Sequence, residues 1–396
     1  MQTCDVLIVG GGPGGSSCAW RLRRAGADVL VIDRKTFPRD KVCAGWVTPQ
    51  VVETLQIDTA EYARGRVFQP ITGFCTGVLG GAEVLSRYDR PMSYGIRRCE
   101  FDQYLLARSG ARVLDGTPLQ SLERRGSRWL VNGQIEAAVV IGAGGHFCPV
   151  ARSLGARQLP GSLVVAAQEI EFAAPIEDLN RGAIRGDTPE LYFCEDLLGY
   201  GWCFRKGDFL NIGLGRTDAE GLTDRVAALV ELLKNRGKIR CEVPTRFHGH
   251  AYQLYERVVP TLVADGTLLV GDAAGLAYSQ SGEGIRPAVE SGLLAAEVIV
   301  EAGGDYSLAR LEPYARRVAE RLGTPRTSSA ADWLPASWLR FAAARLLASR
   351  TFAKRVVLER WFLHTHEPAL RLAEPDAVAS GPHNGERSPF HADRVS

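Results

Sequence analysis

Long apolar runs are missing from this chain of 396 residues. No run reaches the roughly 18 residues that a membrane-spanning helix needs, and no signal peptide precedes the first apolar segment. The chain also lacks an internal repeat, a CxxC pair and a cysteine–histidine cluster, so we expect no structural metal. A net charge of +2 is no strong excess of either sign, and we expect no nucleic-acid partner. These absences favour a globular, cytoplasmic protein.

Cysteine is present but follows no disulfide pattern. The nine cysteines are an odd number and are scattered through strand-like segments, which fits a reducing compartment. With 45% hydrophobic and 23% charged residues, the composition is that of an ordinary globular protein. At this length we expect two closely packed domains and a tail.

The clearest signal lies near the N-terminus. The apolar run Val6–Val9 leads through a glycine-rich turn and a helical segment to a second apolar run, Val29–Ile32, which Asp33 closes. The first glycine permits a tight turn, the second exposes backbone N–H groups to a pyrophosphate, and the last lets helix and strand pack closely. Asp33 is spaced to bind a ribose diol. The pattern predicts a site for FAD or NAD, with contacts from Gly10, Gly12, Pro13, Gly14, Gly15, Asp33 and Arg34.

The rest of the chain alternates between strand-like and helical segments. Strands are predicted at 66–72, 75–86, 162–172, 190–194, 199–206 and 208–215, and helices at 98–108, 223–235, 283–302, 306–322, 336–350 and 352–364. This order predicts an α/β fold: a Rossmann-like domain that binds FAD or NAD, with an inserted, mostly antiparallel substrate-binding sheet and a helical C-terminal region. We expect the cofactor domain at 1–65, 95–160 and 260–305, the sheet domain at 66–94 and 161–259, the helical region at 306–373 and a flexible tail at 374–396.

Four motifs beyond the glycine turn carry a resemblance to a known family. They are the loop Arg39–Trp46, the helix start Arg98-Cys99-Glu100-Phe101-Asp102, the strand Tyr200–Phe204, and the pair Gly271-Asp272-Ala273-Ala274-Gly275 and Gly282-Glu283-Gly284-Ile285. With the order of elements, they resemble the geranylgeranyl reductase family of FAD-dependent oxidoreductases, which have the fold type of para-hydroxybenzoate hydroxylase. The resemblance covers residues 1 to about 300.

This resemblance implies FAD rather than NAD. It implies that Arg98, or its neighbour Arg97, lies against the ribityl and phosphate region and that Asp272 holds a ribityl hydroxyl. It also implies that the helix beginning near Gly282 directs its N–H groups at the flavin, where a helix N-terminus favours the anionic reduced form. The further cofactor contacts that it implies are Lys41, Cys43, Ala44, Arg98, Gly271, Asp272, Gly282, Gly284 and Ile285.

The same resemblance implies a substrate cavity over the flavin. Alternation puts Tyr200, Trp202 and Phe204 on one face of a strand, which would form a wall of that cavity. Arg205 stands where the family has proline, and we expect it to bring a cation near the cavity. A thiol at Cys43 could deliver or relay a proton, although a small packing role fits this residue equally well. The candidate catalytic residues are Cys43, Tyr200 and Trp202.

The implied activity is reduction of carbon–carbon double bonds in a small apolar, isoprenoid-like substrate by hydride from reduced flavin. A flavin monooxygenase would share the FAD-binding residues and stays an alternative, as does a flavin-binding redox sensor without turnover. Gly144 and Cys148 stand where flavin hydroxylases have aspartate and serine. NAD(P)H or another donor therefore stays open as the transient reductant, and the oligomeric state is not indicated.

Positive charge is concentrated near the C-terminus. Residues 309–360 carry eleven Arg and Lys against four Asp and Glu, interleaved with Trp333, Trp338, Phe341, Phe352, Trp361 and Phe362. These helices could lie on anionic lipid as a peripheral membrane contact, or they could form a lid over the cavity. The lid is the favoured interpretation, because aromatic residues at helical spacing are more often core.

Overall fold

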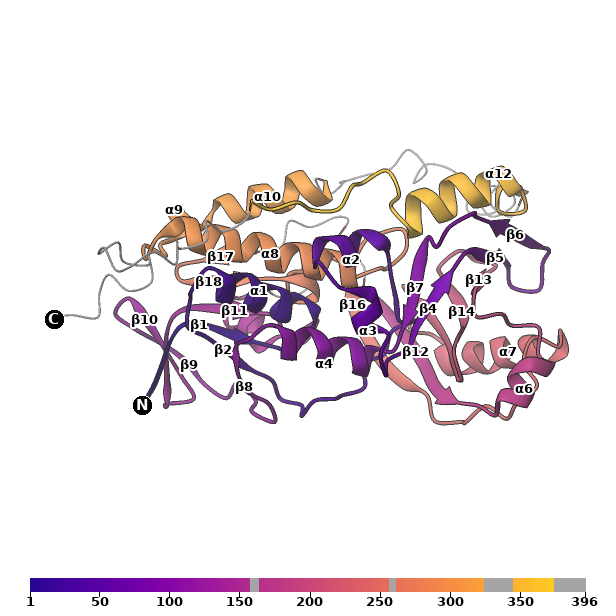
Figure 1. Ribbon diagram of the computed structural model, residues 1–396, viewed down its shortest axis with the longest axis horizontal. Coiled ribbons are helices and arrows are strands. Elements are labelled where there is room, and N and C mark those ends of the chain that lie inside the picture. Colours follow the sequence, from indigo (N-terminus) through magenta and orange to yellow (C-terminus); the bar gives the residue numbers. More distant parts are fainter. Residues whose placement is uncertain (157–163, 256–260, 324–344, 374–396) are drawn as a thin grey trace.

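The computed structural model describes residues 1–156, 164–255, 261–323 and 345–373. Two large sheets lie next to each other along the long axis of the molecule, and C-terminal helices run along one edge (Figure 1). Between them lies a small sheet with the strand order β3-β7-β4, made of β3 (Trp46–Val47), β7 (Ser93–Ile96) and β4 (Phe68–Ile71). The fold is α/β with an inserted, mostly antiparallel sheet, as predicted.

The first sheet contains the N-terminal glycine turn. Its strand order is β17-β18-β11-β1-β2-β8, and all neighbours except β17 and β18 run parallel. The runs Val6–Val9 and Val29–Ile32 are buried throughout, as parallel strands covered on both faces require. The strands are β1 (Gln2–Val9), β2 (Val29–Ile32), β8 (Arg112–Leu114), β11 (Ile135–Gly142), β17 (Val263–Ala264) and β18 (Thr267–Leu269), with the hairpin β9 (Leu122–Arg125) and β10 (Arg128–Val131) attached to β11.

Two helices that are distant in sequence pack together beside this sheet. α1 (Pro13–Arg24) starts directly after the glycine turn and contacts α8 (Ile285–Ala302) along its length. α4 (Arg98–Arg108) packs on the other side of α1. The shorter helices of this half are α2 (Pro49–Thr54), α3 (Thr59–Tyr62), α5 (Pro149–Ser153) and the 3₁₀ turn η1 (Gly271–Ala274).

The second sheet has the strand order β16-β12-β15-β14-β13-β5-β6, and only β13 and β5 pair in parallel. One face packs on α7 (Leu222–Asn235), through buried residues such as Ile212 and Leu229. The opposite face is turned toward the first sheet, so side chains of alternate residues reach the space between them. The elements are β5 (Gly73–Val78), β6 (Glu83–Arg87), β12 (Val164–Ala173), β13 (Glu190–Phe193), β14 (Gly199–Lys206), β15 (Phe209–Arg216), β16 (His248–Gln253) and α6 (Ile176–Arg181).

Some predicted elements are divided in the structure. The predicted helix 306–322 is two helices, α9 (Leu308–Leu311) and α10 (Pro313–Leu322), because Pro313 lacks an N–H and starts a new helix. The predicted strand 75–86 is parts of β5 and β6 joined by a turn at Gly80. β16 was missed because its sequence, His-Gly-His-Ala-Tyr-Gln, has little apolar content, as suits an edge strand.

The segment after the third gap, residues 345–373, returns to the helices beside the first sheet. α12 (Arg350–Phe352) continues into the π-helix η3 (Ala353–Phe362), which lies near β6, and residues 363–373 then run back toward α8 and α10 (Figure 1). The predicted helix 336–350 falls mostly outside the described residues, and the predicted tail 374–396 falls wholly outside them. Among the residues that the structure describes, none of the helices is both long and apolar enough to span a bilayer.

Candidate functional site

A cavity of about 720 Å³ lies between the two large sheets. On one side, residues that follow β1, β2, β11 and β18 line it, so it opens at the carboxyl ends of four neighbouring strands. Ligands in doubly wound folds bind at this end of the sheet. The predicted site residues that line the cavity are Gly10, Gly12, Pro13, Gly14, Asp33, Arg34, Lys41, Cys43, Ala44, Arg98, Tyr200, Trp202, Gly271, Asp272, Gly282, Gly284 and Ile285.

Gly15 is the one predicted site residue that does not line the cavity. A Cβ atom there would lie 2.0 Å from the carbonyl oxygen of Gly10, so only glycine lets α1 approach the turn this closely. Gly10 itself has a φ of 116°, and a Cβ on it would collide with the backbone of Ala143. The two glycines therefore shape the turn from which α1 starts, and Gly12 at the N-cap of that helix faces the cavity.

Asp33 is held at the end of β2 by backbone donors. Its Oδ2 accepts a hydrogen bond from the Gly11 N–H at 2.8 Å, and its Oδ1 accepts one from Lys35 at 2.9 Å. A carboxylate has about four lone-pair positions, so two further donors can still bind. The carboxylate is only 9% exposed and lines the cavity. It can therefore accept hydrogen bonds from the diol of a ribose.

Arg98 is fixed by a buried carboxylate. Its Nε and Nη2 each donate to Asp102 at 2.9 Å, and Asp102 is fully buried. Asp102 also lies 3.3 Å from Nη1 of Arg39, which lines the same cavity and was not predicted. Arg97 instead donates to Glu171 and lies over the ring of Phe209. Of the two neighbouring arginines, Arg98 is the one that lines the cavity.

Asp272 faces two basic groups. His250 of β16 has its Nε2 at 3.7 Å from Oδ2 of Asp272 and at 2.5 Å from Nζ of Lys41. Burial lowers the pKa of Lys41 to about 8, although Asp272 raises it. Burial alone would raise the pKa of Asp272, but His250, Lys41 and Arg98 hold it below its usual range. This end of the cavity therefore holds an anionic carboxylate that can accept a hydrogen bond from a hydroxyl.

An aromatic wall closes the other half of the cavity. Tyr200, Trp202 and Phe204 point from β14 into it. The ring of Trp46 meets Phe204 edge to face at 5.3 Å between ring centres and Phe362 at 5.7 Å. Phe362 is 1% exposed and belongs to the C-terminal helical region. This half of the cavity suits an apolar ligand.

The expectation for Arg205 is wrong. Strand alternation turns its side chain away from the aromatic wall, and its guanidinium donates to the carbonyl of Leu179 and to Asn180 behind the sheet. The cation on the cavity-facing side of β14 is Lys206, whose side chain lies on the same face of the strand as Phe204. Its amine donates to the carbonyls of Ala44 and Ile96, both at 3.0 Å, and so holds the loop that contains Cys43.

The same loop is bonded to the sheet through Asn211. The amide nitrogen of Asn211 donates to the carbonyl of Cys43 at 3.1 Å, and Trp202 donates to the amide oxygen at 2.7 Å. The thiol of Cys43 accepts from the N–H of Gly45 at 3.4 Å. The Trp202 ring also covers Gly213, where an added Cβ would lie 2.3 Å from it. Two candidate catalytic residues are thus connected through a residue that was not predicted.

Sequence reasoning missed most of the polar residues on the sheet side. Glu169 and Glu171 of β12 and His250 of β16 all line the cavity. The signal for the two glutamates was present, because charged residues at positions i and i+2 of an apolar strand share one face. What occupies that face depends on strand pairing, which the sequence pattern did not provide.

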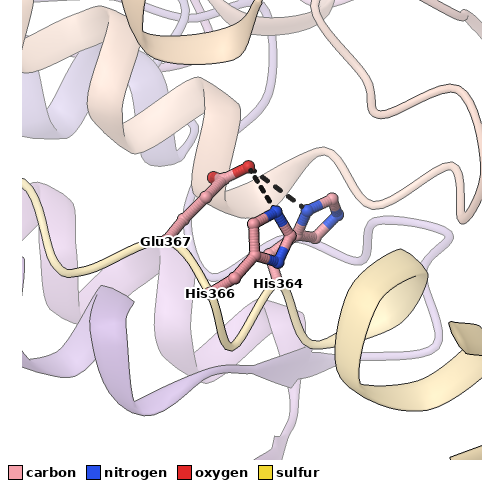
Figure 2. Close-up of side chains that lie close together, drawn as sticks. All are labelled: His364, His366 and Glu367. Atoms are coloured by element: carbon pink, nitrogen blue, oxygen red, sulfur yellow. Dashed lines mark ion pairs between the residues drawn. The ribbon is translucent and has the colours of Figure 1, made fainter. Parts of the chain in front are cut away.

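A second group of side chains anchors the C-terminal segment. His364, His366 and Glu367 lie together after η3, and the Glu367 carboxylate is 3.6 Å from a nitrogen of each histidine (Figure 2). The same carboxylate accepts a hydrogen bond from Tyr278 at 3.1 Å and lies 3.5 Å from Arg286 of α8. These contacts tie the residues that follow Phe362 to the first sheet's helices.

Comparison with known proteins identifies a matching family model and relatives of this chain. Residues 3–182 match a family model described as FAD binding domain. Digeranylgeranylglycerophospholipid reductase of Methanocaldococcus jannaschii is 30% identical over 339 residues, covering 80% of this chain and 82% of that protein. Menaquinone reductase of Mycobacterium tuberculosis is 31% identical over 360 residues, covering 81% of each.

Solved structures share the fold at lower identity. A geranylgeranyl bacteriochlorophyll reductase-like protein from Thermoplasma acidophilum has a TM-score of 0.72 at 22% identity and covers 90% of this chain and 91% of its own. A flavin-dependent halogenase has a TM-score of 0.64 at 22% identity, covering 89% of this chain and 72% of its own. The predicted fold, with its FAD-binding part, is confirmed by these likenesses and by the matching family model.

Proposed function

Since the chain belongs to the geranylgeranyl reductase family of FAD-dependent oxidoreductases, we propose that it reduces carbon–carbon double bonds of an apolar, isoprenoid-like substrate. The observation that carries this proposal is the continuity of the cavity. Gly12 and Asp272 on the cofactor side line the same space as the aromatic residues Trp202 and Phe362. A cofactor and an apolar substrate could therefore meet there without intervening protein.

The residues of the cofactor side fit FAD. When bound, reduced FAD supplies the hydride that the reduction consumes. Asp33 has lone pairs left for the ribose of the adenosine, and Asp272 can accept from the ribityl chain. Arg98, fixed by Asp102, directs fixed donors toward phosphate or ribityl oxygens. These groups would contact both ends of FAD.

The residues of the wall would bind and orient the substrate. Tyr200, Trp202, Phe204 and Phe362 offer apolar surface that excludes water from the reacting double bond. Cys43 lies in the loop between this wall and the cofactor side, where a thiol could deliver or relay a proton. The substrate would thus lie between the aromatic rings and the flavin.

A flavin monooxygenase is the second candidate, since flavin-dependent halogenases share the fold. The two activities differ in whether reduced flavin reacts with the substrate or with dioxygen. NAD(P)H or another donor would reduce the flavin transiently, because the sequence has no second fingerprint for a stably bound nicotinamide. A redox sensor without turnover would bind the same cofactor and reduce nothing.

Anaerobic photoreduction of the FAD-loaded protein tests the proposal. Prenyl substrates or dioxygen are then added, and flavin absorbance and product mass are followed together. We expect a prenyl substrate to reoxidise the flavin without dioxygen and to gain two hydrogen atoms. A product that gains one oxygen atom would identify a monooxygenase. A flavin that no prenyl substrate reoxidises would contradict the proposed reductase activity.

A further inference from the structure

Glu169 is a carboxyl group in the cavity to which the proposed function gives no role. It lies in the middle of β12, is 5% exposed and lines the cavity with Ala167 and Glu171, which share its face of the strand. Burying a carboxyl group is costly unless it is paired with a cation or carries a proton. The groups that contact Glu169 therefore decide whether it is an ionised partner of a cation or carries a proton.

The partners of Glu169 are uncharged donors. The amide nitrogen of Asn211 lies 3.3 Å from its Oε2, and the backbone of Cys43 donates to the same carboxyl group. The indole of Trp202 is only a donor, so its bond to Asn211 Oδ1 fixes the amide with the nitrogen toward the carboxyl groups. Within the described part of the chain, no ion pair joins Glu169.

Glu171 is two residues away on the same face and has the opposite environment. Its Oε1 lies 2.5 Å from Nζ of Lys206, and its Oε2 lies 3.2 Å from Nε of Arg97. Burial alone would raise the pKa of Glu171, but the charges of Lys206 and Arg97 hold it below its usual range. Both nearby cations are thus paired with Glu171, which makes this glutamate the anion of the pair.

The surroundings of Glu169 favour its protonated form. Burial raises its pKa to about 8, against the hydrogen bonds from Cys43 and Asn211 and the attraction of Lys206. The like charge of Glu171 acts in the same direction as burial. The charged and titratable groups that face Glu169 from its own strand, β14, β16 and the Cys43 loop are Glu171, Lys206, His248 and Cys43. Two adjacent carboxyl groups held in different protonation states are a recurrent arrangement for acid catalysis.

We propose that Glu169 is the acid that donates the proton in double-bond reduction, an inference that rests on the proposed function. The π bond of the substrate breaks, one of its carbons takes hydride from reduced FAD, and the other takes the proton of Glu169. Two C–H bonds form, the flavin is oxidised by two electrons, and Glu169 is left as a carboxylate. It regains a proton from water after product release.

The protonation state can be measured without turnover. In infrared spectra of the FAD-loaded protein at neutral pH, Glu169→Gln should lose a carbonyl band of a protonated carboxyl group that the wild type shows. Glu301→Gln is the matched control and should keep that band, because Glu301 is paired with Arg317 and lies outside the cavity lining. If the wild-type and Glu169→Gln spectra are the same in this region, Glu169 is not protonated and the proposal fails.

Single-turnover kinetics test the catalytic step. With photoreduced FAD and a prenyl substrate, Glu169→Gln should slow flavin reoxidation by roughly 10²- to 10⁴-fold, the usual contribution of a general acid. Glu169→Asp should restore part of the rate, and both variants should retain FAD and react with dioxygen like the wild type. A Gln variant with wild-type reoxidation by substrate would overturn the role of Glu169 alone. A wild type that no prenyl substrate reoxidises would instead overturn the proposed function, whatever the infrared result.

Discussion

The indole Nε1 of Trp202 donates a hydrogen bond to Oδ1 of Asn211 at 2.7 Å, and both atoms are buried. This bond orients an amide that contacts the carbonyl of Cys43 and the carboxyl groups of Glu169 and Glu171. The aromatic wall and the polar part of the cavity are thereby one hydrogen-bonded unit. A change in the wall should therefore affect both the apolar and the polar parts of the site.

Trp202→Phe should lower stability and turnover together. Phenylalanine keeps a ring in the wall but leaves the amide oxygen of Asn211 buried without its donor, which costs about 1–3 kcal/mol. Urea unfolding monitored by circular dichroism measures this cost. Phe204→Leu is the control, because Phe204 lies in the same wall and carries no polar atom. Equal unfolding free energies for Trp202→Phe and the wild type would show that the bond contributes nothing.

Asp33→Ala and Asp272→Ala should each weaken retention of non-covalent FAD. Loss of a hydrogen bond to a charged acceptor costs about 1.5–3 kcal/mol, which corresponds to roughly 10- to 100-fold in the dissociation constant. Fluorescence titration of the apoprotein with FAD measures the change. Asp115→Ala is the control, since Asp115 binds the backbone of Phe37 outside the cavity lining. Unchanged affinity in both cavity variants would contradict the assigned cofactor positions.

Cys43→Ser should change turnover more than FAD content, because the residue lies in the loop at the cavity and serine can accept the Gly45 N–H in its place. The loss should be smaller than that of Glu169→Gln if the carboxyl group is the acid. Single-turnover reoxidation of the flavin, with FAD content measured on the same samples, compares the two variants. A larger loss in Cys43→Ser would make the thiol the proton donor, and a wild-type rate would leave it a packing residue.

The free energy of unfolding should depend on pH because Glu169 titrates differently in the folded and unfolded protein. Its folded-state pKa, about 8, is above the usual value, so unfolding releases a proton between the two pKa values. The stability contributed by the protonated carboxyl is complete below the unfolded pKa and is lost as pH rises through about 8. Urea unfolding at about pH 5, 7 and 9 should therefore show that the free energy of unfolding of Glu169→Gln rises relative to that of the wild type as pH rises.

Glu171→Gln is the control for this pH dependence. The pKa of Glu171 is lowered, so its contribution is present above the unfolded pKa and is lost as pH falls through the folded one. The wild type should therefore lose stability relative to Glu171→Gln in acid, which is the opposite direction to the effect of Glu169. A stability difference between the wild type and Glu169→Gln that does not vary with pH would contradict the protonated state.

The C-terminal region should act as a lid rather than as a membrane contact. Phe362 is buried against Trp46 and Tyr200, while Arg355 and Arg360 are exposed. We expect no sedimentation with anionic liposomes at low salt. Exposed basic residues on lipid would contribute on the order of 1 kcal/mol each, so binding that high salt abolishes would support peripheral membrane contact instead. Trp333, Trp338 and Phe341 lie outside the described residues.

Short stretches of sequence determined the cofactor side of this protein. The glycine turn and Asp33 could be predicted because they belong to one short pattern of strand, turn, helix and strand, whereas Asp272 followed from the resemblance to a known family. Alternation within one strand likewise placed Tyr200, Trp202 and Phe204 on a common face. These predictions needed no knowledge of how strands pair.

Tertiary structure decided the polar half of the site. Cys43 and Asn211 are bonded across 168 positions of sequence, and Glu169 lies beside them only because β12 pairs with β15. Which of the two glutamates is ionised depends on which one pairs with Lys206 and Arg97. That pairing is set by the distances between the side-chain atoms and not by the residue type. Desolvation acts through all surrounding atoms, most of them distant in sequence. The sequence by itself therefore determined the glycine turn and the acid of a dinucleotide site, because these depend on local pattern, and the packing of the sheet decided which side chains line the cavity beside them.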